Sequence, residues 1–136
     1  MKRLSIYILL IALSAGALIA CDAAKPKDII TVPCERLEMG CNIDDIRVQT
    51  DRAPSIMRPF KLHVQVPGAD EVYASFAMEG MEMGLNRYRL LAVDSDDWYA
   101  EVTLPVCARG RLDWLLKLDI RAKGTVSQYQ LTFTSE

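Results

Sequence analysis

The chain has a single histidine, His63, among its 136 residues, and this scarcity restricts the chemistry available to it. Acyl transfer requires a serine, cysteine or threonine beside a base, and one histidine on the wetter side of a strand does not supply a triad. Glu79 and Glu82 lack a partner that would mark them as an acid–base pair. We therefore predict that this protein is not an enzyme and has no catalytic residues.

Helical periodicity is also lacking, because no segment places apolar residues at helical spacing over three turns. Apolar and polar residues alternate instead, in segments 60–66, 72–78, 98–104, 112–120 and 129–133 and in shorter ones at 46–48 and 88–93. About seven short strands predict an all-β fold, an immunoglobulin-like antiparallel β-sandwich, with a small β-barrel as the alternative. Trp114 lies in the longest alternation, so we expect it in the core.

Basic charge does not form a stripe, since 16 lysines and arginines are spread among 18 acidic residues and the net charge is −2. Nucleic-acid-binding domains carry a basic patch, so we expect no nucleic-acid partner. The one local concentration of positive charge consists of Arg87, Arg89, Arg109 and Arg111. If strand pairing brings these arginines together, their surface suits a partner bearing carboxylates, but the commoner alternative is four separate surface arginines.

The N-terminal segment has the features of a secretory signal peptide, with the basic pair Lys2 and Arg3 before an apolar run at 6–13. The sequence Leu-Ile-Ala-Cys at 18–21 resembles the lipobox of bacterial lipoproteins. In that motif the cysteine receives a diacylglycerol and fatty acyl groups such as palmitate, and the chain is cut just before it. The alternatives are a short membrane anchor and an ordinary signal peptide with a chance cysteine.

This interpretation predicts three parts: a signal peptide at 1–20, a lipidated Cys21 with a tether at 21–28, and a β-sandwich domain at 29–136. The lipid would hold the domain on a membrane of the bacterial cell envelope, facing the periplasm. Asp22 resembles the signal that retains enteric lipoproteins in the inner membrane, which favours the inner membrane over the outer.

Three cysteines remain after lipidation, namely Cys34, Cys41 and Cys107, and an oxidising compartment favours one disulfide and one free thiol. Cys34 and Cys41 would close a short loop. The alternative is a disulfide across the fold between Cys107 and either Cys34 or Cys41. The sequence does not distinguish between these pairings.

Three of the six methionines lie within six positions, in the stretch FAMEGMEMG. Met78 continues an inward-facing row and is expected in the core, whereas Met81 and Met83 follow Gly80 on a glycine-flanked turn, the methionine turn (residues 78–84). Thioether sulfur is a soft ligand that favours Cu(I), but methionine also adapts well to packing and to protein contacts. The candidate binding residues are Met81, Met83, Arg87 and Arg89. The candidate metal ligands are Met81, Met83 and an unpaired Cys107.

Over about residues 59–133 the chain resembles the YtkA-like and FixH-like domains. The resemblance rests on the order of four features: FAMEGMEMG, NRYRL, WYAEVTLP and a strand with Trp114. These are small secreted or membrane-tethered sandwiches with a glycine–methionine turn, and the resemblance implies a role near copper handling or cytochrome oxidase assembly. The chain departs from that pattern in the stretch PCERLEMGC and in Cys107. It also lacks the transmembrane helix of FixH-like proteins and the paired His and Met pattern of periplasmic copper chaperones.

Two functions follow as hypotheses. The first is a lipid-anchored binding or assembly module that uses the methionine turn as an adaptable contact surface for an envelope protein. The alternative is an accessory protein that binds Cu(I) as its cofactor, for copper handling or oxidase assembly.

Overall fold

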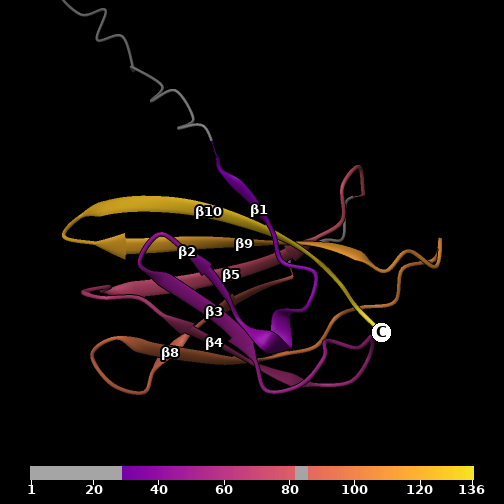
Figure 1. Ribbon diagram of the computed structural model, residues 1–136, viewed down its shortest axis with the longest axis horizontal. Coiled ribbons are helices and arrows are strands. Elements are labelled where there is room, and N and C mark those ends of the chain that lie inside the picture. Colours follow the sequence, from indigo (N-terminus) through magenta and orange to yellow (C-terminus); the bar gives the residue numbers. More distant parts are fainter. Residues whose placement is uncertain (1–28, 82–85) are drawn as a thin grey trace, which may run out of the picture.

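The computed structural model describes residues 29–81 and 86–136, which form ten strands and one short 3-10 helix, η1, at Leu37–Met39 (Figure 1). The first five strands are β1 (Thr31–Pro33), β2 (Cys41–Ile43), β3 (Ile46–Thr50), β4 (Phe60–Gln65) and β5 (Glu71–Ala77). The others are β6 (Arg87–Arg89), β7 (Leu91–Ala92), β8 (Asp97–Val102), β9 (Asp113–Ala122) and β10 (Thr125–Thr134).

The strands form two five-stranded sheets that pack face to face. The first sheet has the order β1-β10-β9-β5-β6 and the second the order β2-β3-β4-β8-β7. The run β3-β4-β8-β7 opposite β10-β9-β5 has the immunoglobulin arrangement of strands A-B-E-D opposite G-F-C. The predicted all-β, immunoglobulin-like sandwich is therefore confirmed, and the two sheets do not close into a barrel.

The core lies between the sheets and is filled by the inward-facing residues of each alternation. Strand β9 alternates buried and more exposed positions along its length, as the period of two predicts. Its Trp114 is buried, and the indole Nε1–H donates a hydrogen bond to Ser135 Oγ at 3.1 Å. Phe76 makes edge-to-face contacts with Phe60 and Phe133 at centroid distances of 6.3 and 6.2 Å. The prediction that Trp114 belongs to the core is confirmed.

The segment predicted as one strand at 88–93 is two strands in different sheets. β6 pairs with β5 in the first sheet, and β7 pairs with β8 in the second. Between them Leu90 is buried and its N–H donates to the Val72 carbonyl at 2.9 Å, whereas Leu91 is exposed. The chain therefore crosses from sheet to sheet just after Leu90. Together with the short strands β1 and β2, this crossing gives ten strands where the alternation predicted about seven.

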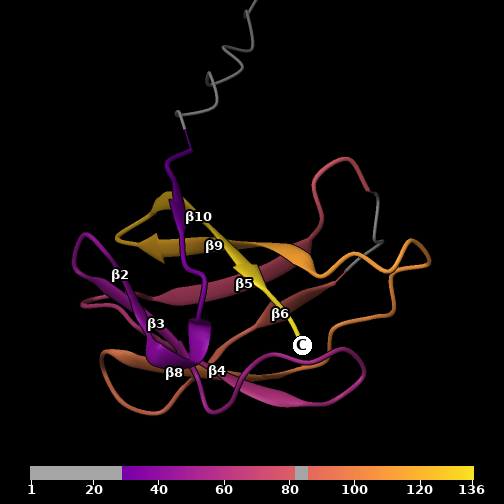
Figure 2. The ribbon, with the colours of Figure 1, turned by 45° about the vertical axis from the view of Figure 1, so that its right-hand side comes forward.

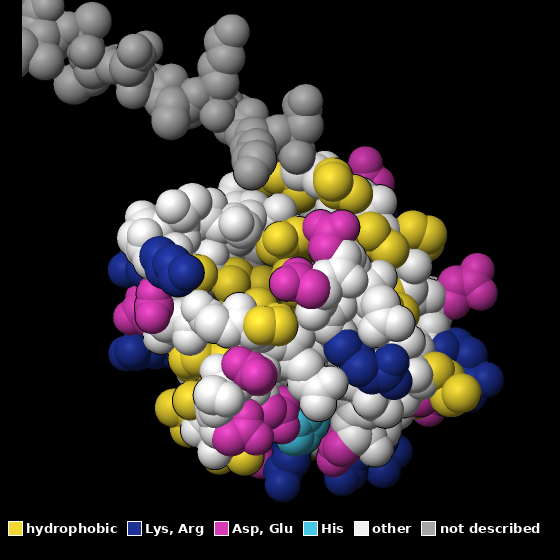
Figure 3. Space-filling view, turned by 60° about the vertical axis from the view of Figure 1, so that its left-hand side comes forward, with side chains coloured by type: hydrophobic (Ala, Val, Ile, Leu, Met, Phe, Trp, Pro, Cys, Tyr) yellow, Lys and Arg dark blue, Asp and Glu magenta, His cyan; other side chains and the backbone are white. Residues whose placement is uncertain are grey.

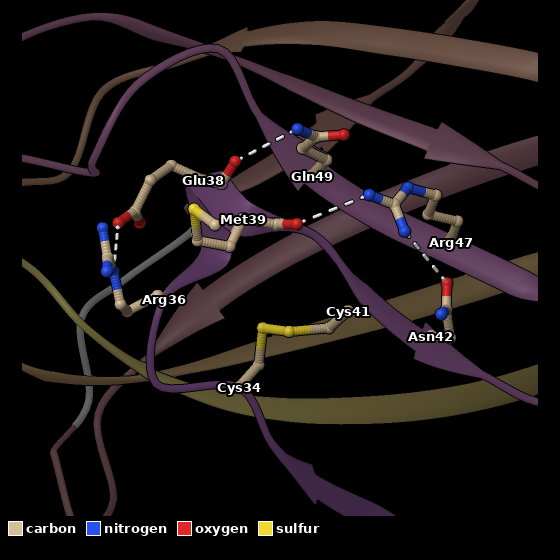
Figure 4. Close-up of a disulfide and its surroundings, with 8 residues drawn as sticks. All are labelled: Cys34, Arg36, Glu38, Met39, Cys41, Asn42, Arg47 and Gln49. Carbon is tan, nitrogen blue, oxygen red and sulfur yellow. Dashed lines mark hydrogen bonds and ion pairs between the residues drawn. A yellow bond between two sulfur atoms is a disulfide. The ribbon is translucent and has the colours of Figure 1, made fainter.

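A disulfide between Cys34 and Cys41 joins the two sheets along one side, with the two Cα atoms 6.0 Å apart (Figure 4). Cys34 follows β1 at the edge of the first sheet, and Cys41 begins β2 at the edge of the second. The enclosed loop packs Leu37 into the core. This pairing is one of those that the sequence left open, and it leaves Cys107 as a free, buried thiol.

Candidate functional site

The described part of the methionine turn, residues 78–81, and the β8–β9 loop (residues 103–112) lie at the same end of the sandwich, on the right in both Figure 1 and Figure 2. In the described part of the turn, the Met81 N–H donates to the Met78 carbonyl at 3.2 Å. Gly80, between them, has a φ of 68°, which suits glycine at the third position of a tight turn. The glycine break therefore reverses the chain directly after the inward-facing row of β5.

The β8–β9 loop is held at its start by the Tyr88 hydroxyl, which donates to the Thr103 carbonyl at 3.0 Å and accepts from the Thr103 N–H at 3.2 Å. Further along, Cys107 is buried and its carbonyl accepts the Gly110 N–H at 3.0 Å, which closes a turn. Val106, next to the buried cysteine, is exposed. The loop thus turns its thiol inward at the rim of the core.

These two segments bring two sulfur atoms into contact. Cys107 Sγ lies 3.4 Å from Met81 Sδ, with the thiol as donor to the thioether. Met81 is half-buried and packs against the core, so it is neither fully enclosed nor freely solvated. We call Met81 and Cys107 the sulfur pair. The structure thus brings together two of the three predicted metal ligands, Met81 and a Cys107 that is free.

Arg111 ties the β8–β9 loop to the methionine turn. Its Nη1 donates to the Glu79 carbonyl at 2.8 Å, and its Nε donates to Asp113 Oδ1 at 2.9 Å while Nη2 bonds the other carboxylate oxygen. The side-chain hydrogen bonds with Asp113 raise the pKa of the Arg111 guanidinium. The same hydrogen bonds lower the pKa of the Asp113 carboxyl. A cation is therefore fixed beside the sulfur pair.

The predicted binding residues Arg87 and Arg89 lie elsewhere, on the outer face of the first sheet. Arg87 pairs with Asp119 at 3.0 Å and lies over the Tyr73 ring, 4.5 Å from its centroid. Arg89 pairs with Glu71 at 3.3 Å. Both arginines point outward because Tyr88 between them points inward. Of the four arginines that the sequence analysis grouped, Arg111 is one that contacts the methionine turn, through the Glu79 carbonyl.

Three other residues named from the sequence are Met83, Cys21 and His63. Met83 and the lipidation candidate Cys21 lie outside the described residues. His63 lies on the outer face of β4, where its ring stacks on Tyr99 at a centroid distance of 6.2 Å. Figure 3, which faces the end of the sandwich away from the sulfur pair, shows the histidine beside acidic side chains, and His63 Nδ1 is 3.9 Å from Asp97 Oδ1.

The donor set at the sulfur pair fits a soft metal ion. Within residues 29–81 and 86–136, no group of three or more His, Cys, Asp or Glu side chains is arranged to hold a metal. A thiolate and a thioether, in contrast, are the ligands that select Cu(I) over harder ions. The residues present therefore fit Cu(I) better than zinc, calcium or magnesium.

Comparison of the chain with known protein families, curated proteins and solved structures gave no match. The likeness to YtkA-like and FixH-like domains therefore stays a prediction. In the described part of the chain, no helix has the length and apolar character needed to span a membrane.

Proposed function

We propose that this protein is an envelope-anchored binding module whose functional surface is the end of the sandwich that carries the sulfur pair, and that its ligand there is Cu(I). The contact between Cys107 Sγ and Met81 Sδ at 3.4 Å carries the proposal. Two soft sulfur donors from segments 26 residues apart meet at the rim of the core. Packing alone would not require a thiol at this position, because an apolar side chain would fill the same space.

The surroundings favour a preformed site over a chance contact. Arg111 bonds the turn at Glu79, and Tyr88 holds the loop at Thr103, so both sulfur-bearing segments are fastened to the sheets. Preorganised ligands lose less conformational entropy when a metal binds. A buried free thiol is also shielded from disulfide exchange, which keeps it available as a ligand in an oxidising compartment.

Cu(I) affinity measured by competition with a chromophoric Cu(I) chelator, without oxygen and with the Cys34–Cys41 disulfide intact, tests this function. We expect Met81→Leu and Cys107→Ser each to lower the affinity by at least about tenfold, as loss of a metal ligand should. Met39→Leu is the matched control, because Met39 is exposed in the disulfide loop far along the chain from the sulfur pair. Failure of the wild-type protein to compete with the chelator would rule the proposal out.

A second function, docking of a protein partner, is favoured by exposed apolar residues on the β8–β9 loop. Val106 is 64% exposed and Leu112 is 41% exposed, on either side of the buried Cys107. Arg109, between them, is exposed as well, so the loop presents apolar and cationic groups together. Such a surface suits a partner with an apolar contact rimmed by carboxylates.

In-cell crosslinking from a photoreactive residue at position 109 tests the docking function. Val106→Asp should abolish the crosslinked adduct and leave Cu(I) affinity unchanged, because an exposed side chain is not a ligand. An adduct that forms equally well with Val106→Asp would contradict the partner surface.

A further inference from the structure

Met78 and Met81 form an antiparallel bridge across the methionine turn, with Glu79 and Gly80 as the two turn residues. Residues that face each other across a two-residue hairpin point their side chains to the same side of the ribbon. The Met78 thioether therefore lies on the same side of the turn as the Met81 thioether.

That side is the core side. Met78 is only 2% exposed and ends the inward row of β5, while Met81 and Cys107 pack against the same apolar cluster. The alternation accounts for an apolar residue at position 78 but does not require sulfur there, since leucine fills a similar volume. Met78 and Met81 thus face the same side of the turn, and Cys107 contacts Met81 on that side.

We propose that Met78 is the third sulfur ligand, so that Met78, Met81 and Cys107 form a closed Cys–Met–Met site for Cu(I). This inference rests on the proposed function and names the complete donor set of its site. The ligand that the sequence favoured as the third, Met83, is not needed for it.

Charge balance explains why such a site would select Cu(I). On binding, the Cys107 thiol gives up its proton to solvent and its sulfur forms a bond to the metal, with no change in oxidation state. One thiolate neutralises the single charge of Cu(I), and the two thioethers add none, so the metal together with its three ligands carries no net charge. A divalent ion would leave one uncompensated positive charge at the rim of the apolar core and near the Arg111 guanidinium, which is costly.

The test compares Met78→Leu with Met83→Leu in the full chain. Cu(I) affinity is measured by chelator competition, and the number of sulfur atoms bound to copper is measured by X-ray absorption. We expect three sulfurs in the wild type and in Met83→Leu. For Met78→Leu we expect two sulfurs and an affinity at least about tenfold lower.

The outcomes separate this inference from the proposed function. If the wild type binds Cu(I) but Met78→Leu keeps three sulfurs and full affinity, or if Met83→Leu loses a sulfur, the donor set is wrong and the function stands. A wild type that binds no Cu(I) overturns both. If Met78→Leu does not fold, the sulfur counts of the wild type and Met83→Leu still decide, since a count of two in the wild type contradicts the three-sulfur site.

Discussion

At the scale of single residues, Trp114 and Cys107 differ in how far the sequence could place them. Trp114 belongs to a long alternation, and the period of two alone put it in the core. Cys107 lies in a loop that has no periodicity, so the sequence did not place its side chain. Whether its thiol is free also depended on which two of the three cysteines form the disulfide. The contact with Met81 spans 26 residues and is made by loop geometry, which local pattern does not encode.

Trp114→Ala should lower the free energy of unfolding by about 3–5 kcal/mol, because it removes a large, fully packed side chain. Ser135→Ala should cost about 1–3 kcal/mol, since it leaves the buried indole N–H without its acceptor. Urea denaturation followed by circular dichroism measures both, with the exposed neighbour Thr134→Ala as control. A Ser135→Ala variant as stable as the control would show that the hydrogen bond contributes nothing.

The Arg111–Asp113 ion pair should make stability sensitive to acid. Because the hydrogen bonds from Arg111 lower the pKa of Asp113 in the folded state, the pair stabilises the fold above the unfolded-state pKa of about 3.9. That stabilisation is lost as the pH falls through the lower, folded-state pKa. The urea midpoints of wild type and Asp113→Asn should therefore differ near neutral pH and converge in strong acid.

Both partners of this pair are substantially exposed, so the difference should be small and should shrink at high salt. Glu101→Gln is a suitable control, because Glu101 is an exposed carboxylate on β8. A gap between wild type and Asp113→Asn that persists unchanged into strong acid would mean that the carboxylate does not act through its charge.

At the scale of elements, the methionine turn and the β4–β5 turn offer a matched comparison. Gly80 and Gly68 both have positive φ, 68° and 66°, and a Cβ at either position would meet no atom within 4 Å. Alanine at either site should therefore cost only backbone strain, about 1 kcal/mol.

Because the two turns lie at opposite ends of β5, Gly80→Ala should in addition weaken Cu(I) binding, whereas Gly68→Ala should leave it unchanged. Thermal denaturation and chelator competition on the two variants measure the two effects separately. Equal Cu(I) affinities in the two variants would indicate that the geometry of the turn does not position the sulfurs.

The Cys34–Cys41 disulfide is a second feature at this scale that substitution can remove without touching the sulfur pair. Replacing Cys34 and Cys41 by alanine opens a loop with a sequence separation of 7, which should cost about 2.5 kcal/mol by the chain-entropy relation. Cu(I) binding should survive, since neither cysteine belongs to the sulfur pair. Urea denaturation of the double variant checks the cost, and loss of Cu(I) binding in a folded double variant would contradict this separation of roles.

The alternation of apolar and polar residues did not predict where some strands begin and end. The pattern over 88–93 predicted one strand, because an inward Tyr88 and Leu90 followed by apolar Leu91 continue an apolar run. The change of sheet after Leu90 is determined by tertiary packing and not by the local sequence pattern. It occurs where the Leu90 N–H bonds to the Val72 carbonyl and the chain then leaves β5. Strands β1 and β2 are too short, at three residues each, to show any alternation.

At the scale of the whole molecule, the lipid anchor remains a prediction with a direct test. Cys21→Ser should release the protein from membranes or block its processing, because the thiol is the atom that would be acylated. Membrane fractionation and the mass of the mature protein measure this, with Cys107→Ser as a control that should fractionate like the wild type. A Cys21→Ser protein that is processed and stays with the membranes would exclude lipidation at this residue.

The parallel pairing of β1 with β10 has a mechanical consequence. β1 runs toward the end of the sandwich that carries the sulfur pair, and its ladder to β10 includes bonds from Gln130 to Ile30 and from Cys34 to Thr132. If a partner bound at that end and the chain N-terminal to Ile29 pulled in opposite directions, the force would act along β1. Such tension slides β1 against β10 and stretches its hydrogen bonds together, whereas a force across the strand would peel them apart one at a time. Beyond the ladder, the Cys34–Cys41 bond passes the tension on to the second sheet, so reducing it should lower the force at which the domain ruptures.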